Sequence, residues 1–129
     1  MCELFIQADR RFWQSTTRSI RVGGVVTSVR LEAFFWSTLT EIADRDGHSI
    51  GQLITRLYIE YTQAEHDLGN FTSFLRVCCS RYLSLIADGR LDRDPDTPLS
   101  DIDAEPLLKA EAEDVARRGT AGAQRHDPE

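Results

Sequence analysis

The segment of residues 25–31, VVTSVRL, constrains the fold of this chain more than any other. Its side chains alternate between two faces, as they do in a β-strand. One face carries Val25, Thr27, Val29 and Leu31, and the other carries Val26, Ser28 and Arg30. A helical pattern begins directly afterwards, so the strand is short, and a short strand with unpaired edges is unstable alone. We therefore expect it to pair with another strand, most simply the same strand of a second copy.

The residues before this strand leave a second arrangement open. Residues 19–22 also alternate, with Ile20 and Val22 on one face, and Gly23-Gly24 follows. Two glycines can adopt the positive φ angles of a hairpin turn, so the strand could gain a neighbour from its own chain. Alternatively, the glycines are a flexible entry into a single strand. The choice decides whether pairing with a second copy would give a sheet of two strands or of four. Residues 1–7 could form a further short strand.

Apolar residues at helical spacing predict three helices after the strand. The first covers about 33–46 and ends at Gly47, a natural C-terminal stop. Ser49 is a good N-cap for the second, whose apolar stripe continues to about residue 66. The third follows the cap Asn70 and ends near residue 88. We thus expect a mainly α protein with a short β-ribbon, divided into an N-terminal arm (1–24), a core (25–66), a third helix (67–88) and a tail (89–129).

Charge is distributed unevenly along the chain. Residues 88–129 hold twelve acidic and six basic residues, whereas residues 1–87 hold nine of each. From Arg10 to Leu31 there are five arginines and no acidic residue. The tail is rich in Asp and Pro and short of large apolar side chains, which predicts disorder, with a weak helix at most over residues 107–118. A basic front suits docking on an anion, although charge alone favours the simpler interpretation of a solvated surface with a charged tail.

The strand and the next two helices comprise about forty residues, which is too few to bury a sufficient core. Two copies would solve the problem by pairing their strands antiparallel, with four helices packed beneath. The residues expected in this dimer core are Val29, Leu31, Phe35, Leu39, Leu53, Ile54 and Leu57. The result would be a homodimer with a two-stranded ribbon that has one free face.

A two-stranded ribbon fits the major groove of B-DNA, which suggests a role for the free face. Arg30 could donate two hydrogen bonds to guanine, Ser28 could bond to either base type, and Val26 could touch a thymine methyl group. Phosphate contacts are expected at the start of the second helix, where His48 and Ser49 precede free backbone N–H groups. The remaining phosphate candidates are Arg18 and Arg21 of the basic front.

The run VTSVRLEAFFWSTLTEIADRDGHSIGQLITRLY resembles the ribbon-helix-helix family, the fold of small β-ribbon repressors. The matching parts are the strand, RLE entering the first helix, EIADRDG at its end, and Ser followed by QLI in the second helix. The longer run through NFTSFLRVCCSRYL resembles a bacterial subfamily that keeps a third helix, so the resemblance covers roughly residues 1–87. It implies a dimer that binds DNA through the strand, with the base-reading positions at Val26, Ser28 and Arg30 and the phosphate anchor near Ser49.

These observations predict a sequence-specific DNA-binding transcriptional regulator, a repressor, that acts as a cytoplasmic homodimer or higher oligomer. The alternative is an interaction or assembly module without DNA binding, whose partner surface would include Phe34, Trp36 and Phe71. We expect no enzyme, because no phosphate loop, nucleophile elbow or metal-ligand spacing appears. No cofactor, metal or membrane partner is expected either, since no stretch approaches the roughly 18 apolar residues of a membrane span. The three cysteines are expected to be free thiols.

Overall fold

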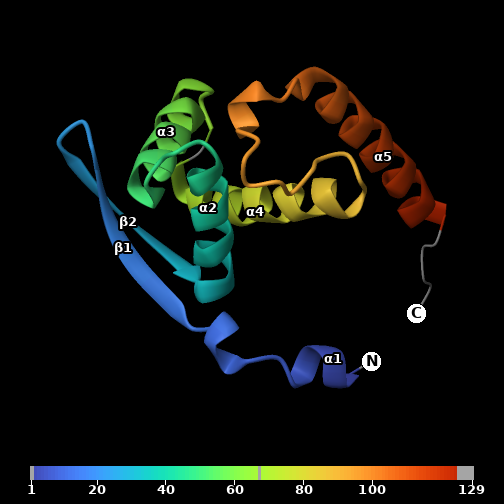
Figure 1. Ribbon diagram of the computed structural model, residues 1–129, viewed down its shortest axis with the longest axis horizontal. Helices are drawn as coiled ribbons and strands as arrows, with labels where there is room; N and C mark the ends of the chain where they lie inside the picture. The colour runs from blue at the N-terminus through green and yellow to red at the C-terminus, as the bar shows by residue number, and fades with distance from the viewer. Residues whose placement is uncertain (1, 67, 125–129) are drawn as a thin grey trace. The chain divides into compact units, whose positions relative to one another are not determined.

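The computed structural model describes residues 2–66 and 68–124, and Figure 1 shows their arrangement. The helices and strands are α1 (Cys2–Ile6), β1 (Ser15–Val22), β2 (Val25–Glu32), α2 (Ala33–Arg45), α3 (Ile50–Gln63), α4 (Phe71–Ala87) and α5 (Ala104–Gln124). Short 3-10 helices lie at Arg10–Phe12, Leu68–Asn70 and Leu99–Asp101. The chain divides into two compact units, Met1–Leu99 and Ser100–Glu129, and the first contains everything from α1 to α4.

Residues 15–32 form a β-hairpin, which resolves the choice that the sequence left open. Gly23 has a φ of 56° and Gly24 a φ of 83°, so both occupy the left-handed region that a two-residue hairpin turn needs. β1 and β2 pair antiparallel along their whole length, from Ser15 opposite Glu32 to Val22 opposite Val25. β1 therefore supplies one partner strand for β2 within the chain, along one edge of β2, and the pairing of β2 with a second copy along its other edge stays a prediction.

The inner face of the hairpin packs on α2, α3 and α4 to form one apolar core. Four of the seven residues expected in a dimer core are at most 1% exposed within this single chain: Val29, Leu31, Leu39 and Ile54. The other three, Phe35, Leu53 and Leu57, are half-buried against the same core. α4 contributes Leu75 and Cys79, both fully buried. The third helix thus provides much of the apolar cover that the sequence assigned to a second copy.

The two aromatic residues that were expected in a partner surface together with Phe34 also belong to this core. Trp36 is 5% exposed and Phe71 is 4% exposed, so neither is available to another protein. Phe34 is different, because 41% of its surface remains exposed at the start of α2. The N-terminal residues differ from the expected strand as well, since Cys2–Ile6 is a helix. Phe5 interrupts the alternation there, and within the described residues no neighbouring strand holds the segment extended.

The segment after α4 has more structure than its composition predicts. Leu91 is buried, and the buried guanidinium of Arg45 donates to the backbone carbonyl of Thr97 through Nε (3.1 Å) and Nη2 (2.9 Å). Arg93 forms a two-point ion pair with Glu41 of α2. These contacts fix residues 90–97 against α2, although the segment itself has few apolar side chains. The expected weak helix over residues 107–118 is longer, Ala104–Gln124, because Ala, Glu, Leu and Arg favour helices. Residues 125–129 of the predicted disordered tail lie outside the described residues.

Candidate nucleic-acid interface

The outer face of the hairpin is a continuous strip of exposed side chains. Residues directly opposite each other on paired strands point to the same side of the sheet. Four cross-strand pairs share the alternation of the outer face: Thr17 with Arg30, Ser19 with Ser28, Arg21 with Val26, and Ser15 with Glu32 at the end beside α2. Glu32 is half-buried and forms an ion pair with Arg76 of α4, so the first three pairs make up the exposed strip. All six side chains are exposed, none is acidic, and within the described part of the chain neither arginine has an acidic partner. This strip is therefore open, polar and positively charged.

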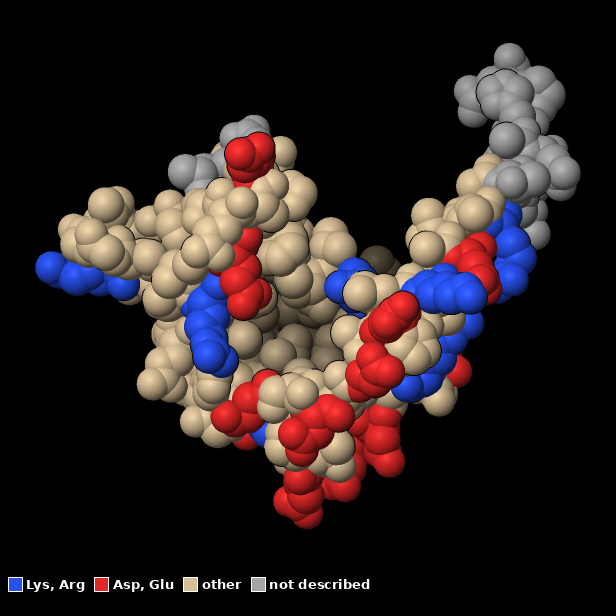
Figure 2. All heavy atoms as spheres, turned by 90° about the horizontal axis from the view of Figure 1, so that it is seen from above, with Lys and Arg blue, Asp and Glu red and all other residues tan. Residues whose placement is uncertain are grey.

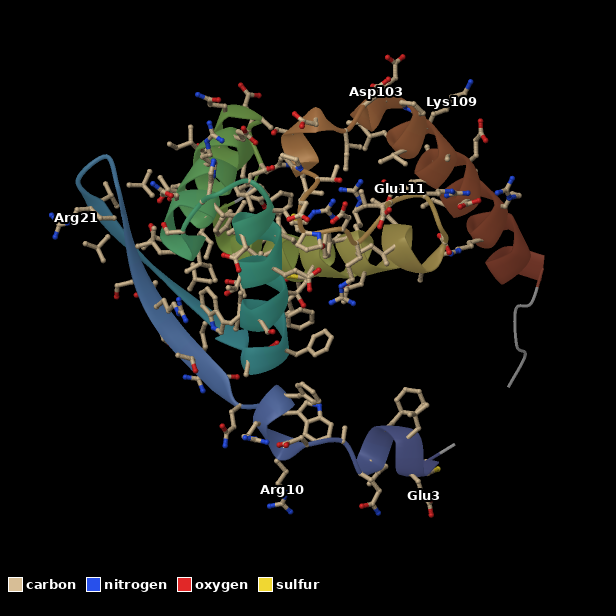
Figure 3. The ribbon with its side chains drawn as sticks, viewed as in Figure 1. Glu3, Arg10, Arg21, Asp103, Lys109 and Glu111 are labelled. Carbon is tan, nitrogen blue, oxygen red and sulfur yellow. The ribbon has the colours of Figure 1, made fainter. Side chains whose placement is uncertain are left out.

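The charge of the strip is concentrated at its two ends. Arg30 lies near the start of α2, and Arg21 lies beside the turn, where it points away from the helices (Figure 3). In the space-filling view of Figure 2, basic side chains project from the surface at the left of the picture, and acidic side chains also lie on the face shown. The rows of Arg30 and Arg21 are four residues apart, or about 14 Å along an antiparallel strand. Small polar side chains lie between them.

Arg18 belongs to the opposite face of the hairpin. Its guanidinium carbon lies 4.8 Å from the centre of the Trp36 ring, a cation–π contact. The indole N–H of Trp36 donates to the backbone carbonyl of Thr16 (2.9 Å), which fastens β1 to α2. Arg18 therefore contributes to the attachment of the strand to the helix, and its phosphate contact stays a prediction.

A hollow of about 700 Å³ lies between the outer edge of β1 and the start of α3. Its lining residues are Ser19, Ile20, Arg21, Gly47, His48, Ser49, Gly51, Gln52, Thr55 and Arg56. The His48 ring nitrogen Nε2 lies 3.5 Å from Nη1 of the Arg56 guanidinium, so two basic side chains meet near the N-terminus of α3. Arg21 lines the strand side of the hollow, while its side chain points away from the helices (Figure 3). The positive end of the α3 dipole and the His48–Arg56 pair favour an anion.

The backbone donors at the start of α3 are divided between the helix cap and solvent. Ser49 Oγ accepts a hydrogen bond from the Gln52 N–H (3.1 Å), and Gln52 Oε1 accepts one from the Ser49 N–H (2.8 Å). This capping box occupies the hydroxyl of Ser49 and its own N–H. The N–H groups of Ile50 and Gly51 remain as the first-turn donors that could meet a phosphate. Gly51 has no side chain, so its backbone is easy to approach.

Sequence reasoning placed the base-reading candidates on one open face, and the structure shows all three exposed there. It missed Thr17 and Ser19, which join that face only when the hairpin register is known. It grouped Arg18 with Arg21, although their odd spacing along a strand puts them on opposite faces. It also missed Arg56, whose distance from His48 depends on the fold of α3.

Other kinds of chemistry find little support in the described part of the chain. Among residues 2–66 and 68–124, no three His, Cys, Asp or Glu side chains come together in a way that could hold a metal ion. Burial raises the pKa of the Cys79 thiol to about 12, so this thiol is a packing group that donates to the Phe35 carbonyl. No helix in the same residues is long and apolar enough to cross a membrane.

An antiparallel ribbon followed by two helices and a third packed helix defines a small ribbon-helix-helix protein. A family model, the ribbon-helix-helix domain, matches residues 15–83, from the first residue of β1 into α4. The match spans more than half of the chain, and the protein belongs to the ribbon-helix-helix domain family, which confirms the resemblance seen in the sequence. Members of the family typically dimerise and commonly bind DNA.

A solved structure extends the comparison to nearly the whole chain. An uncharacterized protein from Bordetella pertussis Tohama I has a similar structure, with 52% sequence identity and a TM-score of 0.79. The similarity covers 84% of this chain and 86% of the other. No curated protein matches this sequence. The hairpin, which belongs to the matched family region, is thus a feature of the domain and not an addition to it.

Proposed function

We propose that this protein is a DNA-binding transcriptional regulator that inserts the outer face of the β1–β2 hairpin into the major groove. The observation that carries the proposal is the open strip itself, whose exposed side chains include two arginines and no acidic residue. Because these side chains are exposed, they contribute little to the stability of the fold. A polyanion whose groove admits two strands is the ligand that it fits.

The width of the hairpin supports groove insertion. Paired strands lie about 4.8 Å apart, so a two-stranded ribbon enters a groove of about 12 Å. A dimer that joined the β2 strands of two hairpins would make a four-stranded sheet, which is too wide. In this proposal the hairpin of one chain is therefore the complete ribbon, and the dimer forms without pairing of β2 strands.

Base readout is assigned to the strip. Arg30 has the geometry to donate two hydrogen bonds to guanine, Ser28 can bond to either base type, and Val26 can contact a thymine methyl group. Arg21 lies about 14 Å from the Arg30 row, which corresponds to about four base-pair steps of 3.4 Å. The strip thus addresses a short run of bases, with an arginine near each end.

Phosphate contact is assigned to the hollow beside β1. Gly51 with its free N–H group, His48 and Arg56 line this hollow, together with Arg21 of the hairpin. A ribbon in the groove needs a backbone anchor next to it, because phosphate contacts set the register while base contacts set the sequence. The proposal extends to repression, since a protein in the groove excludes others from the same base pairs.

The test compares two arginines that differ in position and not in charge. Arg30→Ala should weaken binding to a selected duplex by about 1–3 kcal/mol and relax the sequence preference. Arg10→Ala, an exposed change outside the strip, should reduce affinity much less. Both are measured by fluorescence anisotropy over a range of salt concentrations. Equal affinities of the two variants, or no binding of DNA by the wild type at low salt, would refute the proposal.

The alternative function, an assembly module without DNA binding, is favoured by a different observation. The N-terminal segment exposes several large apolar side chains beside Phe34, which is unusual for a protein without a protein partner. A self-associating protein that bound no DNA in the anisotropy measurement would establish this alternative.

A further inference from the structure

The outer face of β1 carries two hydroxyl side chains, Thr17 and Ser19, that take no part in packing. Both are exposed, and among the described residues neither hydroxyl has a hydrogen-bond partner. They stand directly opposite Arg30 and Ser28 of β2. On the basis of the DNA binding proposed above, we propose that β1 is a second base-reading strand, in which Thr17 and Ser19 help to determine the preferred DNA sequence.

The two strands of the hairpin reach a groove together. β1 and β2 pair antiparallel from one end of the hairpin to the other, and they lie side by side in Figure 1. Paired strands are about 4.8 Å apart, which is well within the roughly 12 Å width of the major groove. Their outer side chains point to the same side of the sheet. Placing the outer face of β2 against the bases therefore places that of β1 there as well.

The pairing register indicates which bases β1 would meet. Opposite residues on paired strands have Cβ atoms about 4.5–5.5 Å apart, whereas successive base pairs are about 3.4 Å apart. Thr17 thus faces the base pair that Arg30 contacts or a neighbouring one. Ser19 has the same relation to the base pair that Ser28 contacts.

The chemistry of the two side chains suits base edges. A threonine methyl group packs on the methyl group of thymine, and the hydroxyl of threonine or serine can bond to either base type. Both side chains are short, so the backbone of β1 can approach the bases closely. Thr17 is therefore assigned a thymine beside the guanine of Arg30, and Ser19 is assigned a single hydrogen bond.

The backbone around Thr17 is held in place before DNA binds. The indole N–H of Trp36 donates to the Thr16 carbonyl (2.9 Å), and the Arg18 guanidinium carbon lies 4.8 Å from the centre of the Trp36 ring. These contacts involve the residues on either side of Thr17, so α2 fastens β1 from its inner face and leaves the outer face free. A side chain on a fixed backbone loses less freedom on binding, which favours a selective contact.

A ribbon of another composition would give Thr17 no such contact. If the β2 strands of two copies formed the reading ribbon, the β1 strands would be the outer strands of a four-stranded sheet. Thr17 would then lie outside a groove that admits two strands. The contribution of Thr17 to sequence preference therefore distinguishes a hairpin in the groove from a pair of β2 strands there.

The experiment compares two threonines that are neighbours in β1 and belong to opposite faces. A preferred duplex is first selected from a random library with the full wild-type chain. Thr17→Ser, which removes one methyl group, should lower the affinity for that duplex about fourfold. It should also relax the preference at the base pair affected by Arg30→Ala or at a neighbouring one. Thr16→Ser removes the same group from the other face and should change neither quantity.

Ser19→Ala is the second variant, and it should lower the affinity about fivefold, the usual effect of one lost hydrogen bond. Fluorescence anisotropy over a range of salt concentrations gives all the affinities. The salt dependence should stay as in the wild type, because no phosphate contact is removed. A relaxed sequence preference in either variant, with Thr16→Ser unchanged, supports base reading by β1.

Other results would overturn base reading by β1. If both variants kept the wild-type preference while Arg30→Ala relaxed it, only β2 would read bases, and the proposed function would stand. An equal loss of affinity for all duplexes, with a weaker salt dependence, would assign the two hydroxyls to phosphates. The same effect from Thr16→Ser as from Thr17→Ser would mean that the strand had changed and no base contact had been lost. A wild type that bound no DNA at low salt would refute both this inference and the proposed function.

Discussion

The two faces of the β1–β2 hairpin are built from the same stretch, residues 15–32, yet they meet different demands. On the inner face, Val29 and Leu31 are at most 1% exposed and Arg18 lies over the Trp36 ring. On the outer face, the side chains of the strip's three cross-strand pairs are exposed. The inner residues are constrained by packing, whereas packing within the described part of the chain does not constrain the outer ones. The outer face is therefore the side of the hairpin that packing leaves free for the proposed DNA contact.

The largest expected effect tests the inner face. Leu31→Ala should lower the free energy of unfolding by about 2–5 kcal/mol, because it leaves a cavity in a fully buried site. Its neighbour Arg30→Ala, on the exposed face, should change stability by no more than about 0.5 kcal/mol. Urea unfolding followed by circular dichroism measures both. A loss of comparable size for Arg30→Ala would mean that the outer face also takes part in packing.

A smaller effect separates two arginines of the same strand. Arg18→Ala should lower the free energy of unfolding by about 0.5–1 kcal/mol, the usual contribution of an exposed cation–π contact. Arg21→Ala should leave stability unchanged but should weaken DNA binding and flatten its dependence on salt. Thermal unfolding and salt-dependent anisotropy of both variants give the comparison. If Arg18→Ala weakened DNA binding as Arg21→Ala does and left the free energy of unfolding unchanged, the stabilising role of Arg18 on the inner face would be wrong.

The smallest effect concerns Glu41, whose carboxylate forms an ion pair within the fold, in contrast to the arginines of the outer face. Hydrogen bonding by Arg93, aided by the Tyr82 hydroxyl and by the charge of Arg45, lowers the pKa of Glu41 below its usual 4.5. The ionised Glu41 therefore stabilises the folded state above pH 4.5, and this contribution is lost as the pH falls through its lowered pKa.

Glu41→Gln should accordingly cost stability at neutral pH, and its deficit relative to wild type should shrink as the pH falls below 4.5. Thermal unfolding at a series of pH values measures the deficit. Glu60→Gln, an exposed change on α3, controls for the loss of one negative charge. A deficit that stayed constant with pH would show that the charge of Glu41 contributes nothing.

Much of the fold could be predicted because it follows from local patterns. The alternation in β2 identified Val29 and Leu31 as inner residues and Ser28 and Arg30 as outer ones. Helix ends were predicted closely where a cap or a glycine marked them, as at Ser49. The hairpin could not be settled, since two glycines suit a tight turn and a flexible linker equally.

The remaining differences arise from contacts between residues far apart in the sequence. The burial of the core by α4 and the pairing of Arg93 with Glu41 join positions that no periodicity connects. Only the β2 half of the strip was predicted, because the β1 residues on the same face can be identified only from the register of β1 with β2. The sequence assigned the residues before β1 to an N-terminal arm. The exposure of large apolar side chains there, such as Phe5 and Trp13, can be seen only in the folded chain.

The turn at Gly23 and Gly24 has a consequence for the kind of DNA sequence that such a ribbon can read. A ribbon made from two copies of one strand repeats the same side chains, and so it matches a palindrome. Here the two strands are unequal, with Thr17, Ser19 and Arg21 on one and Val26, Ser28 and Arg30 on the other. A base sequence matched to this ribbon would have no internal dyad. Inverted repeats would then arise only between the separate sites of two chains, at a spacing set by how those chains are joined.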